Sequence, residues 1–155
     1  MLVHSITPIL NVSDIGQSFA WFEALGWQRG FSWNDGGFIG NGDQGLAADA
    51  NGPALFGSVC SGVTTIFLCC GRQGSRGTIM PRFSGDDETD GVWMTWWMGS
   101  PAEVDELHAS AVHAGMIVTH PPTNKPWGIR EFHLRHPDGH MFRASSGSGS
   151  ADNSA

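Results

Sequence analysis

ITPILNVSDIGQSFAWFEALGW, which spans Ile6–Trp27, is the stretch that decides the fold of this 155-residue chain. Its first part, Ile6 to Val12, is rich in β-branched and apolar residues and predicts a strand. Ser13 and Asp14 then offer side chains that cap helix N-termini, and Gly26 is a typical helix end. Between them, apolar residues recur at helical spacing: Ile15, Phe19, Phe22 and Leu25. The chain therefore opens with a strand followed by a helix.

Further strand-like pieces complete the first half of the chain. They are Trp27 to Trp33, a piece around Phe38, and Val63 to Cys70. Turns rich in Gly and Asn, such as NDGG at residues 34–37, separate them. The first half therefore has the predicted order βαβββ.

The same order recurs after a polar, Gly-rich linker at residues 71–90. Val92 to Met98 predicts a strand, and Ser100 with Pro101 predicts the start of a helix that reaches Gly115. Three strand patterns follow: Met116 to Thr119, Arg130 to His136 and Met141 to Ala144. The halves, about residues 5–70 and 91–145, predict one α+β domain over residues 1–145, built from two βαβββ modules. The Gly/Ser-rich tail at residues 146–155 is expected to be disordered.

Composition and charge exclude several classes of protein. The formal net charge is −7 and the eight Lys and Arg residues form no run, so no nucleic-acid partner is expected. No window approaches the roughly 18 apolar residues of a membrane span, so we expect a cytoplasmic protein without a membrane partner. Cys69 and Cys70 lie in the apolar run IFLCC and are expected to be unreactive core residues in a reducing compartment. The acidic balance permits a cationic small-molecule ligand.

Two motifs make the chain resemble a known superfamily. The opening stretch is similar to the first strand and helix of the glyoxalase, bleomycin-resistance and extradiol-dioxygenase proteins, also called the vicinal oxygen chelate superfamily. PWGIREFHLRHPDGH, at residues 126–140, resembles the closing segment of the metal-free bleomycin-resistance proteins. The resemblance spans Ile6 to Ala144. It implies two modules in a curled mixed sheet, with the helices on its convex face, a ligand groove on its concave face, and a homodimer.

The resemblance also locates the positions at which enzymes of the superfamily hold a divalent metal. These positions fall on Thr7, Trp93 and Arg143, with a fourth near Phe67. Indole and guanidinium groups offer no lone pair to a cation. In addition, residues 50–85 contain no Asp, Glu or His. We therefore expect no metal and no other cofactor.

The histidines do not form a zinc pattern in the sequence. His108 and His113 are five residues apart on the predicted second helix and are expected at the surface. His133, His136 and His140 cluster around a predicted hairpin. By strand alternation His133 faces the cavity while the other two flank the turn, so a two-histidine metal site there lacks a third ligand.

Strand alternation predicts which side chains line the concave face. Every second residue of VWMTWWM, at 92–98, and of REFHLRH, at 130–136, points there, while Phe132 and Leu134 point toward the helices. The side chains expected in this pocket are Thr7, Asn11, Trp93, Thr95, Trp97, Glu131, His133, Arg135 and Arg143. Aromatic walls with a few polar anchors are typical of small-molecule sites.

The resemblance adds two aromatic residues to the predicted site. Trp127 matches a tryptophan that stacks on the planar part of a bound drug, and Phe38 lies near a second aromatic position of the groove. Trp127 is equally suited to packing in a dimer interface. The residues expected to bind the ligand are Phe38, Trp93, Trp97, Trp127, Glu131, His133 and Arg143. No catalytic residue is expected.

These features predict a binding protein rather than an enzyme: a metal-free homodimer that sequesters a planar or cationic antibiotic-like molecule. Three alternatives stay open. One is a glyoxalase-like lyase, isomerase or dioxygenase with displaced metal ligands. Another is a metal-independent enzyme with Glu131 or His133 as general base. The third is a sensor or an accessory protein of a biosynthetic pathway.

Overall fold

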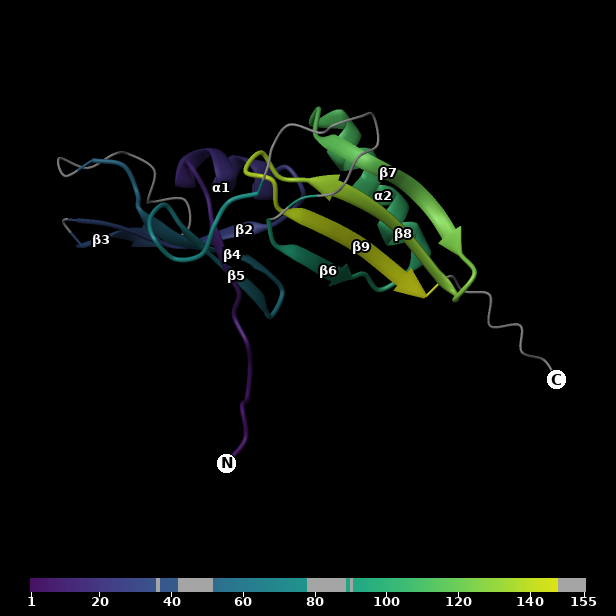
Figure 1. The fold of residues 1–155 in the computed structure, drawn as a ribbon, viewed down its shortest axis with the longest axis horizontal. Helices are drawn as coiled ribbons and strands as arrows, with labels where there is room; N and C mark the ends of the chain where they lie inside the picture. The colour runs from purple at the N-terminus through teal and green to yellow at the C-terminus, as the bar shows by residue number, and fades with distance from the viewer. Residues whose placement is uncertain (36, 42–51, 78–88, 90, 148–155) are drawn as a thin grey trace. The chain divides into compact units, whose positions relative to one another are not determined.

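The computed structural model describes residues 1–35, 37–41, 52–77, 89 and 91–147, and of residues 37–41 it describes the backbone. The chain forms two compact units, Met1–Arg76 and Gly77–Ala155 (Figure 1). Their boundary lies inside the predicted linker at residues 71–90. The prediction of one domain over residues 1–145 stays a prediction. No helix of the described residues is long and apolar enough to cross a membrane.

The described residues of the first unit form a five-stranded mixed sheet and one helix. Its elements are β1 (Ile9–Asn11), α1 (Ile15–Glu23), β2 (Gln28–Asn34), β3 (Gly37–Asn41), β4 (Phe56–Ser61) and β5 (Thr64–Cys69). The strand order is β1-β5-β4-β2-β3. β1 runs parallel to β5, and all other neighbours are antiparallel.

In the second unit, the part of the chain that the structure describes forms a four-stranded mixed sheet and one helix. Its elements are β6 (Trp93–Trp97), α2 (Pro101–His113), β7 (Ile117–Lys125), β8 (Ile129–Arg135) and β9 (Met141–Gly147). The strand order is β6-β9-β8-β7, and Figure 1 shows β9 between β6 and β8. β6 runs parallel to β9, and the other neighbours are antiparallel.

The two units repeat one topology. In each, the first strand lies parallel beside the last strand, and the remaining strands follow in reverse chain order, except that β3 lies beyond β2 at the edge of the first sheet. β1, α1, β2, β4 and β5 therefore correspond to β6, α2, β7, β8 and β9, while β3 is an additional edge strand of the first unit. The prediction of an α+β fold made of two βαβββ modules is confirmed.

Both helices begin where the sequence offers a capping side chain. Before α1, the Asp14 carboxylate accepts a hydrogen bond from the Gln17 N–H at 2.9 Å. Before α2, the Ser100 hydroxyl accepts from the Glu103 N–H at 3.3 Å, and the Glu103 carboxylate accepts from the Gly99 N–H at 2.6 Å. These contacts satisfy N–H groups that a helix start leaves without intrahelical partners.

Each helix packs against one face of its own sheet. In the first unit the Phe19 ring lies over Gly57 of β4, where a Cβ atom would come within 2.7 Å of the ring. In the second unit the His108 ring of α2 packs edge-on against Phe132 of β8, with 5.2 Å between ring centroids. Phe132 therefore faces the helix, as predicted. His108 is half-buried, with Phe132 as the packing partner of its ring, whereas His113 is exposed, as predicted.

β4 is the strand that the sequence patterns did not predict. Its sequence FGSVCS contains one Gly and two Ser, which are typical of turns. It forms a strand because all six of its residues pair with β5 across a two-residue turn at Gly62 and Val63. Gly62 has φ 57°, which suits the first central position of such a turn. The predicted strand around Phe38 is present as β3, but at the edge of the sheet.

β7 continues six residues beyond the predicted end at Thr119, through Pro121 and Pro122 to Lys125. β7 is the edge strand of its sheet. A proline costs no ladder hydrogen bond where its position faces the open edge. The pairing with β8 adjusts by register shifts around His120. The two prolines therefore do not end the strand.

β9 reaches Gly147, three residues beyond the predicted end. Ser145 and Ser146 are buried and pair with β8. Ser146 and Gly147 therefore belong to the strand and not to the predicted disordered tail, because the ladder to β8 satisfies their backbone groups. The rest of that tail, residues 148–155, lies outside the described residues.

Candidate functional site

The face of the second sheet that points away from α2 carries most of the predicted site residues. Trp93 on β6, Glu131 and His133 on β8, and Arg143 on β9 alternate with residues of the opposite face, among which Trp96, Phe132, Leu134, Phe142 and Ala144 are buried. His133 pairs with Arg143 across β8 and β9, and with His120 of β7 on its other side. The open-face cluster consists of Trp93, His120, Lys125, Glu131, His133 and Arg143.

Glu131 is the centre of the open-face cluster. It is buried, with 4% of its surface exposed. The His133 Nε2 atom lies 3.4 Å from Oε1, the Arg143 Nε atom lies 3.7 Å from Oε2, and the Ser145 hydroxyl donates to Oε2 at 3.5 Å. These distances exceed the roughly 2.8 Å of a charge-assisted hydrogen bond. Arg143 therefore balances the charge of the carboxylate without being fully engaged by it.

Lys125 brings a second cation into the cluster. Its Nζ atom lies 2.9 Å from the His120 Nε2 atom, and the His120 ring lies 5.0 Å from the His133 ring between centroids. An ammonium group only donates, so the His120 Nε2 atom accepts and the ring is neutral, with its proton on Nδ1. The Lys125 Nζ atom also lies 6.0 Å from the centroid of the Trp127 ring, at the limit of a cation–π contact.

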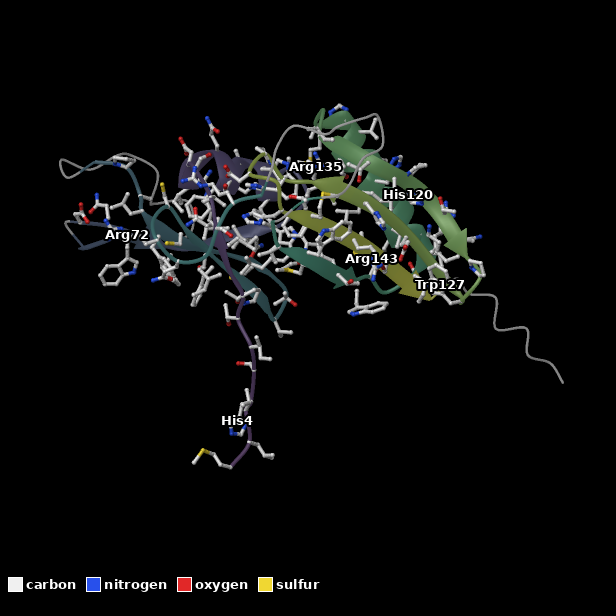
Figure 2. The ribbon with its side chains drawn as sticks, in the orientation of Figure 1. His4, Arg72, His120, Trp127, Arg135 and Arg143 are labelled. Atoms are coloured by element: carbon white, nitrogen blue, oxygen red, sulfur yellow. The ribbon has the colours of Figure 1, made fainter. Side chains whose placement is uncertain are left out.

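Three exposed tryptophans belong to the second unit. Trp93 is 42% exposed, and its ring stands edge-on to the His133 ring at 5.6 Å between centroids. Trp97, two residues further along β6, is 72% exposed, and Trp127 is 67% exposed. Figure 2 shows Trp127 at the end of the β7–β8 hairpin, with His120 on β7 and Arg143 on β9. The sheet therefore offers aromatic surface next to its polar groups.

The turn between β7 and β8 determines the position of Trp127. Its three residues are Pro126, Trp127 and Gly128, between the paired residues Lys125 and Ile129. The Gly128 N–H donates to the Lys125 carbonyl at 3.1 Å. Proline suits the first position of this turn, and Gly128 adopts φ 81° without strain. The geometry of the turn thus explains Pro126 and Gly128 of the motif PWG without reference to a ligand.

Four of the seven predicted ligand-binding residues come together in the open-face cluster, and Trp127 is connected to it through Lys125. Trp97 lies on the same side of β6 as Trp93. Phe38 lies on β3 of the first unit, and its side chain is outside the described residues. Whether these seven residues bind a ligand stays a prediction.

The first-unit residues of the predicted pocket have other surroundings. Thr7 is exposed ahead of β1. Phe67 packs against two other phenylalanine rings, each at 5.5 Å between centroids. The buried Asn11 amide donates to the carbonyls of residues 71, 73 and 74 at 2.6–3.3 Å, and its Oδ1 atom accepts from the Arg76 Nε atom at 3.0 Å. Asn11 therefore holds residues 71–76, which corrects its prediction as a pocket anchor.

His136 and His140 hold the turn before β9. The His136 Nδ1 atom accepts from the Asp138 N–H at 3.0 Å, and the His140 Nδ1 atom accepts from the Val92 N–H at 3.1 Å. Both rings are buried. Burial lowers the pKa of His136 from 6.5 to about 4; the Asp138 carboxylate opposes this effect and His140 adds to it. The Nδ1 atoms of both histidines therefore accept hydrogen bonds from the backbone.

The described residues do not fit a resident divalent metal. Among them, no group of three or more His, Cys, Asp or Glu side chains is placed to hold one. Within the open-face cluster, the Lys125 ammonium engages His120, and the Arg143 guanidinium lies beside Glu131. A metal ion at either group would be repelled by a positive charge that the chain already supplies.

His120 and Lys125 are the residues of the cluster that sequence reasoning missed. With a strand predicted to end at Thr119, both fall in an expected loop. The available signal is the turn Pro126–Gly128, because a hairpin turn of this type requires that the preceding strand end at Lys125. The chemistry of the two side chains alone does not single them out.

The cysteines are free thiols. Cys69 is buried, as predicted. Cys70 is only partly buried, and its thiol donates to the Ser13 carbonyl at 3.3 Å. The prediction of a packed core position is therefore wrong for Cys70, because its side chain lies beside the segment that leads into α1.

No family model and no curated protein matches the chain. Solved structures do. The glyoxalase/bleomycin resistance protein/dioxygenase from Nocardioides is 14% identical, with a TM-score of 0.59 over 100% of this chain and 91% of its own. FosX, the fosfomycin resistance protein of Listeria monocytogenes, is 14% identical, with a TM-score of 0.61 over 96% and 97%. A bleomycin-binding protein complexed with bleomycin is 17% identical, with a TM-score of 0.58 over 94% and 100%.

Proposed function

We propose, from the premise that this chain has the glyoxalase/bleomycin-resistance fold of the vicinal oxygen chelate superfamily, that it is a metal-free binding protein. It sequesters a planar, antibiotic-like small molecule as a cytoplasmic homodimer. The open-face cluster carries this proposal, because exposed Trp93 stands beside buried polar groups centred on Glu131. Binding alone protects a cell when the affinity for the toxic molecule exceeds that of its target.

The cluster favours a planar ligand over a cationic one. Trp93 offers an exposed indole for stacking. The groups that attract cations are already matched within the chain, since Arg143 lies beside Glu131 and Lys125 lies over Trp127. The same two cations support the proposal that no metal takes part.

A metal-independent enzyme is the second candidate function. The His133 Nε2 atom lies 3.4 Å from the Glu131 Oε1 atom, and imidazole–carboxylate pairs serve as general bases in many enzymes. A catalyst would convert its bound ligand, whereas a sequestering protein returns it unchanged. Mass spectrometry of ligand recovered after long incubation distinguishes the two.

Titration calorimetry on chelator-dialysed protein tests the binding proposal. Bleomycin and the neutral planar compound 2-naphthamide serve as probes. We expect saturable binding of at least one probe, and we expect Trp93→Ala or Trp127→Ala to weaken it by roughly 1–3 kcal/mol. Val112→Ala is the matched control, because it removes an exposed apolar side chain from α2 instead of the open face.

Two results would contradict the proposal. About one Zn, Fe, Mn or Ni ion per chain in untagged purified protein would show that the site is a metal site. Unchanged affinity in both tryptophan variants would move the ligand away from the open-face cluster.

A further inference from the structure

We infer that the ligand of the open-face cluster is anionic: a planar ring system whose carboxylate or other oxyanion lies against the Arg143 guanidinium. This inference rests on the proposed function, because it names the charge of the molecule that the same site takes. It reverses the expectation drawn from the overall acidity of the chain.

The first observation is the distribution of charge along the second sheet. The whole chain has 15 Asp and Glu residues against eight Lys and Arg. Strands β6–β9 instead contain four basic residues and a single carboxylate, Glu131. The basic residues are Lys125, Arg130, Arg135 and Arg143. Arg130 is paired with Asp105 of α2 and Arg135 is buried, so Lys125 and Arg143 are the two cations of the open-face cluster, which contains one acid.

The second observation is how loosely Arg143 is held. Arg130 contacts the Asp105 carboxylate through two nitrogens at 2.7 and 2.9 Å, which is a close ion pair. Arg143 instead lies 3.7 Å from the Glu131 carboxylate, measured from Nε to Oε2, and its side chain is 44% exposed. Among the described residues, none accepts a hydrogen bond from its two terminal nitrogens. A guanidinium fork of this kind fits an oxyanion in a bidentate manner.

The third observation is that the aromatic surface and the guanidinium flank the same residue. The Trp93 ring lies edge-on to the His133 ring at 5.6 Å between centroids. Arg143 is the cross-strand partner of His133 on β9. Residues paired across antiparallel strands are roughly 5 Å apart at their Cβ atoms. One ligand of two fused rings therefore reaches both the indole and the fork.

A cationic ligand meets the opposite situation. It would approach the positive charges of Arg143 and Lys125, and Lys125 already engages the acceptor nitrogen of His120. No carboxylate of strands β6–β9 other than Glu131 is present to attract it, and Glu131 is buried beside Arg143. Like charges at short range in a partly desolvated site oppose binding.

Three probes that share one ring system test the charge of the ligand. They are 2-naphthoate, neutral 2-naphthamide and 2-naphthylmethylammonium, titrated at low salt and pH 7.5 into the full chain. We expect naphthoate to bind at least about tenfold more tightly than the ammonium probe. Arg143→Gln removes the preference for naphthoate over naphthamide, measured as the ratio of the two affinities in the same variant. Arg143→Lys keeps the charge without the fork and retains part of the preference.

Arg72→Gln is the matched control, because it changes the net charge equally but removes an exposed arginine of the first unit (Figure 2). It should leave the naphthoate preference intact. Equal affinity for all three probes, or tightest binding of the ammonium probe, would overturn the inference, while binding of naphthamide would still support the planar-ligand proposal. Failure of all three probes to bind would count against the proposed function, and the inference would fall with it.

Discussion

At the scale of single residues, burial determines the charge state of a histidine side chain and thereby affects stability. His136 is the clearest case, since its ring is buried and its Nδ1 atom accepts a backbone hydrogen bond. A protonated ring would lose that bond and carry a charge in a poorly solvated site. The titratable neighbours are Asp138 and His140, which act on it in opposite directions.

We predict that the free energy of unfolding falls as the pH is lowered from 6.5 to 4. The folded pKa of His136 is about 4 and the unfolded value is 6.5. Between these values the unfolded chain binds a proton that the folded chain does not, so acid favours unfolding. The full effect is about 3 kcal/mol. Urea denaturation at a series of pH values measures it.

His136→Asn is the variant that isolates this effect. Asparagine does not titrate, and its carbonyl oxygen takes the place of the Nδ1 acceptor. The variant should be less stable at pH 7 but show a shallower dependence of stability on pH between 4 and 6.5. An unchanged slope would assign the acid sensitivity to other groups.

At the scale of elements, two hairpin turns define the ends of β8. The Gly128 turn precedes the strand, and the turn at Gly139 follows it. Both glycines have positive φ, of 81° and 79°. They differ in their surroundings: a Cβ atom at Gly128 meets nothing within 4 Å, whereas one at Gly139 would lie 2.5 Å from the Gly77 carbonyl carbon.

We predict a graded series of alanine substitutions. Gly128→Ala should cost roughly 1–2 kcal/mol, because only the left-handed conformation is penalised. Gly139→Ala should cost more than 3 kcal/mol, because strain is added to a backbone clash. Gly147→Ala is the control, since this strand-end glycine has neither positive φ nor a neighbour within 4 Å. Urea denaturation of the three variants checks the order, and equal costs would contradict this account.

At the scale of the whole molecule, the first seven residues of the chain are exposed. Residues 1–8 precede β1, and Figure 1 shows them running away from the strands of their unit. Their apolar side chains Leu2, Val3 and Ile6 are exposed. Pro8 leads into β1, one of the two edge strands of the first sheet, where its missing N–H is tolerated. Exposed apolar side chains on an extended segment suit burial against a second copy of the chain.

We predict a twofold dimer of about 33 kDa, from two chains of 16.6 kDa, with two ligands per dimer. Light scattering measures the mass, and calorimetry measures the ligand count. The triple variant Leu2→Ser, Val3→Ser, Ile6→Ser should weaken the dimer, while serine at exposed Val63 should not. A monomer that binds ligand with full affinity would show that no groove is shared between subunits.

Local rules were sufficient for the parts of the molecule that local chemistry controls. Asp14 and Ser100 mark the helix starts because capping acts within three residues. Alternation correctly separated Trp93 and Trp97 from buried Trp96, because side chains of a strand change face at every residue. The repeated order of elements identified the two-module fold, because each element was predicted from its own local pattern.

What only the tertiary structure decided depends on partners far away in the chain. β4 is a strand because its backbone pairs with β5. Pro121 is tolerated because β7 is an edge strand. The Asn11 side chain forms hydrogen bonds with the segment at residues 71–76. The alternation that aims Glu131 outward says nothing about the distance to Arg143 twelve residues later. Sequence by itself determined which face each side chain takes, whereas strand order and register decided which side chains meet, because hydrogen bonds between strands join residues that no local pattern relates.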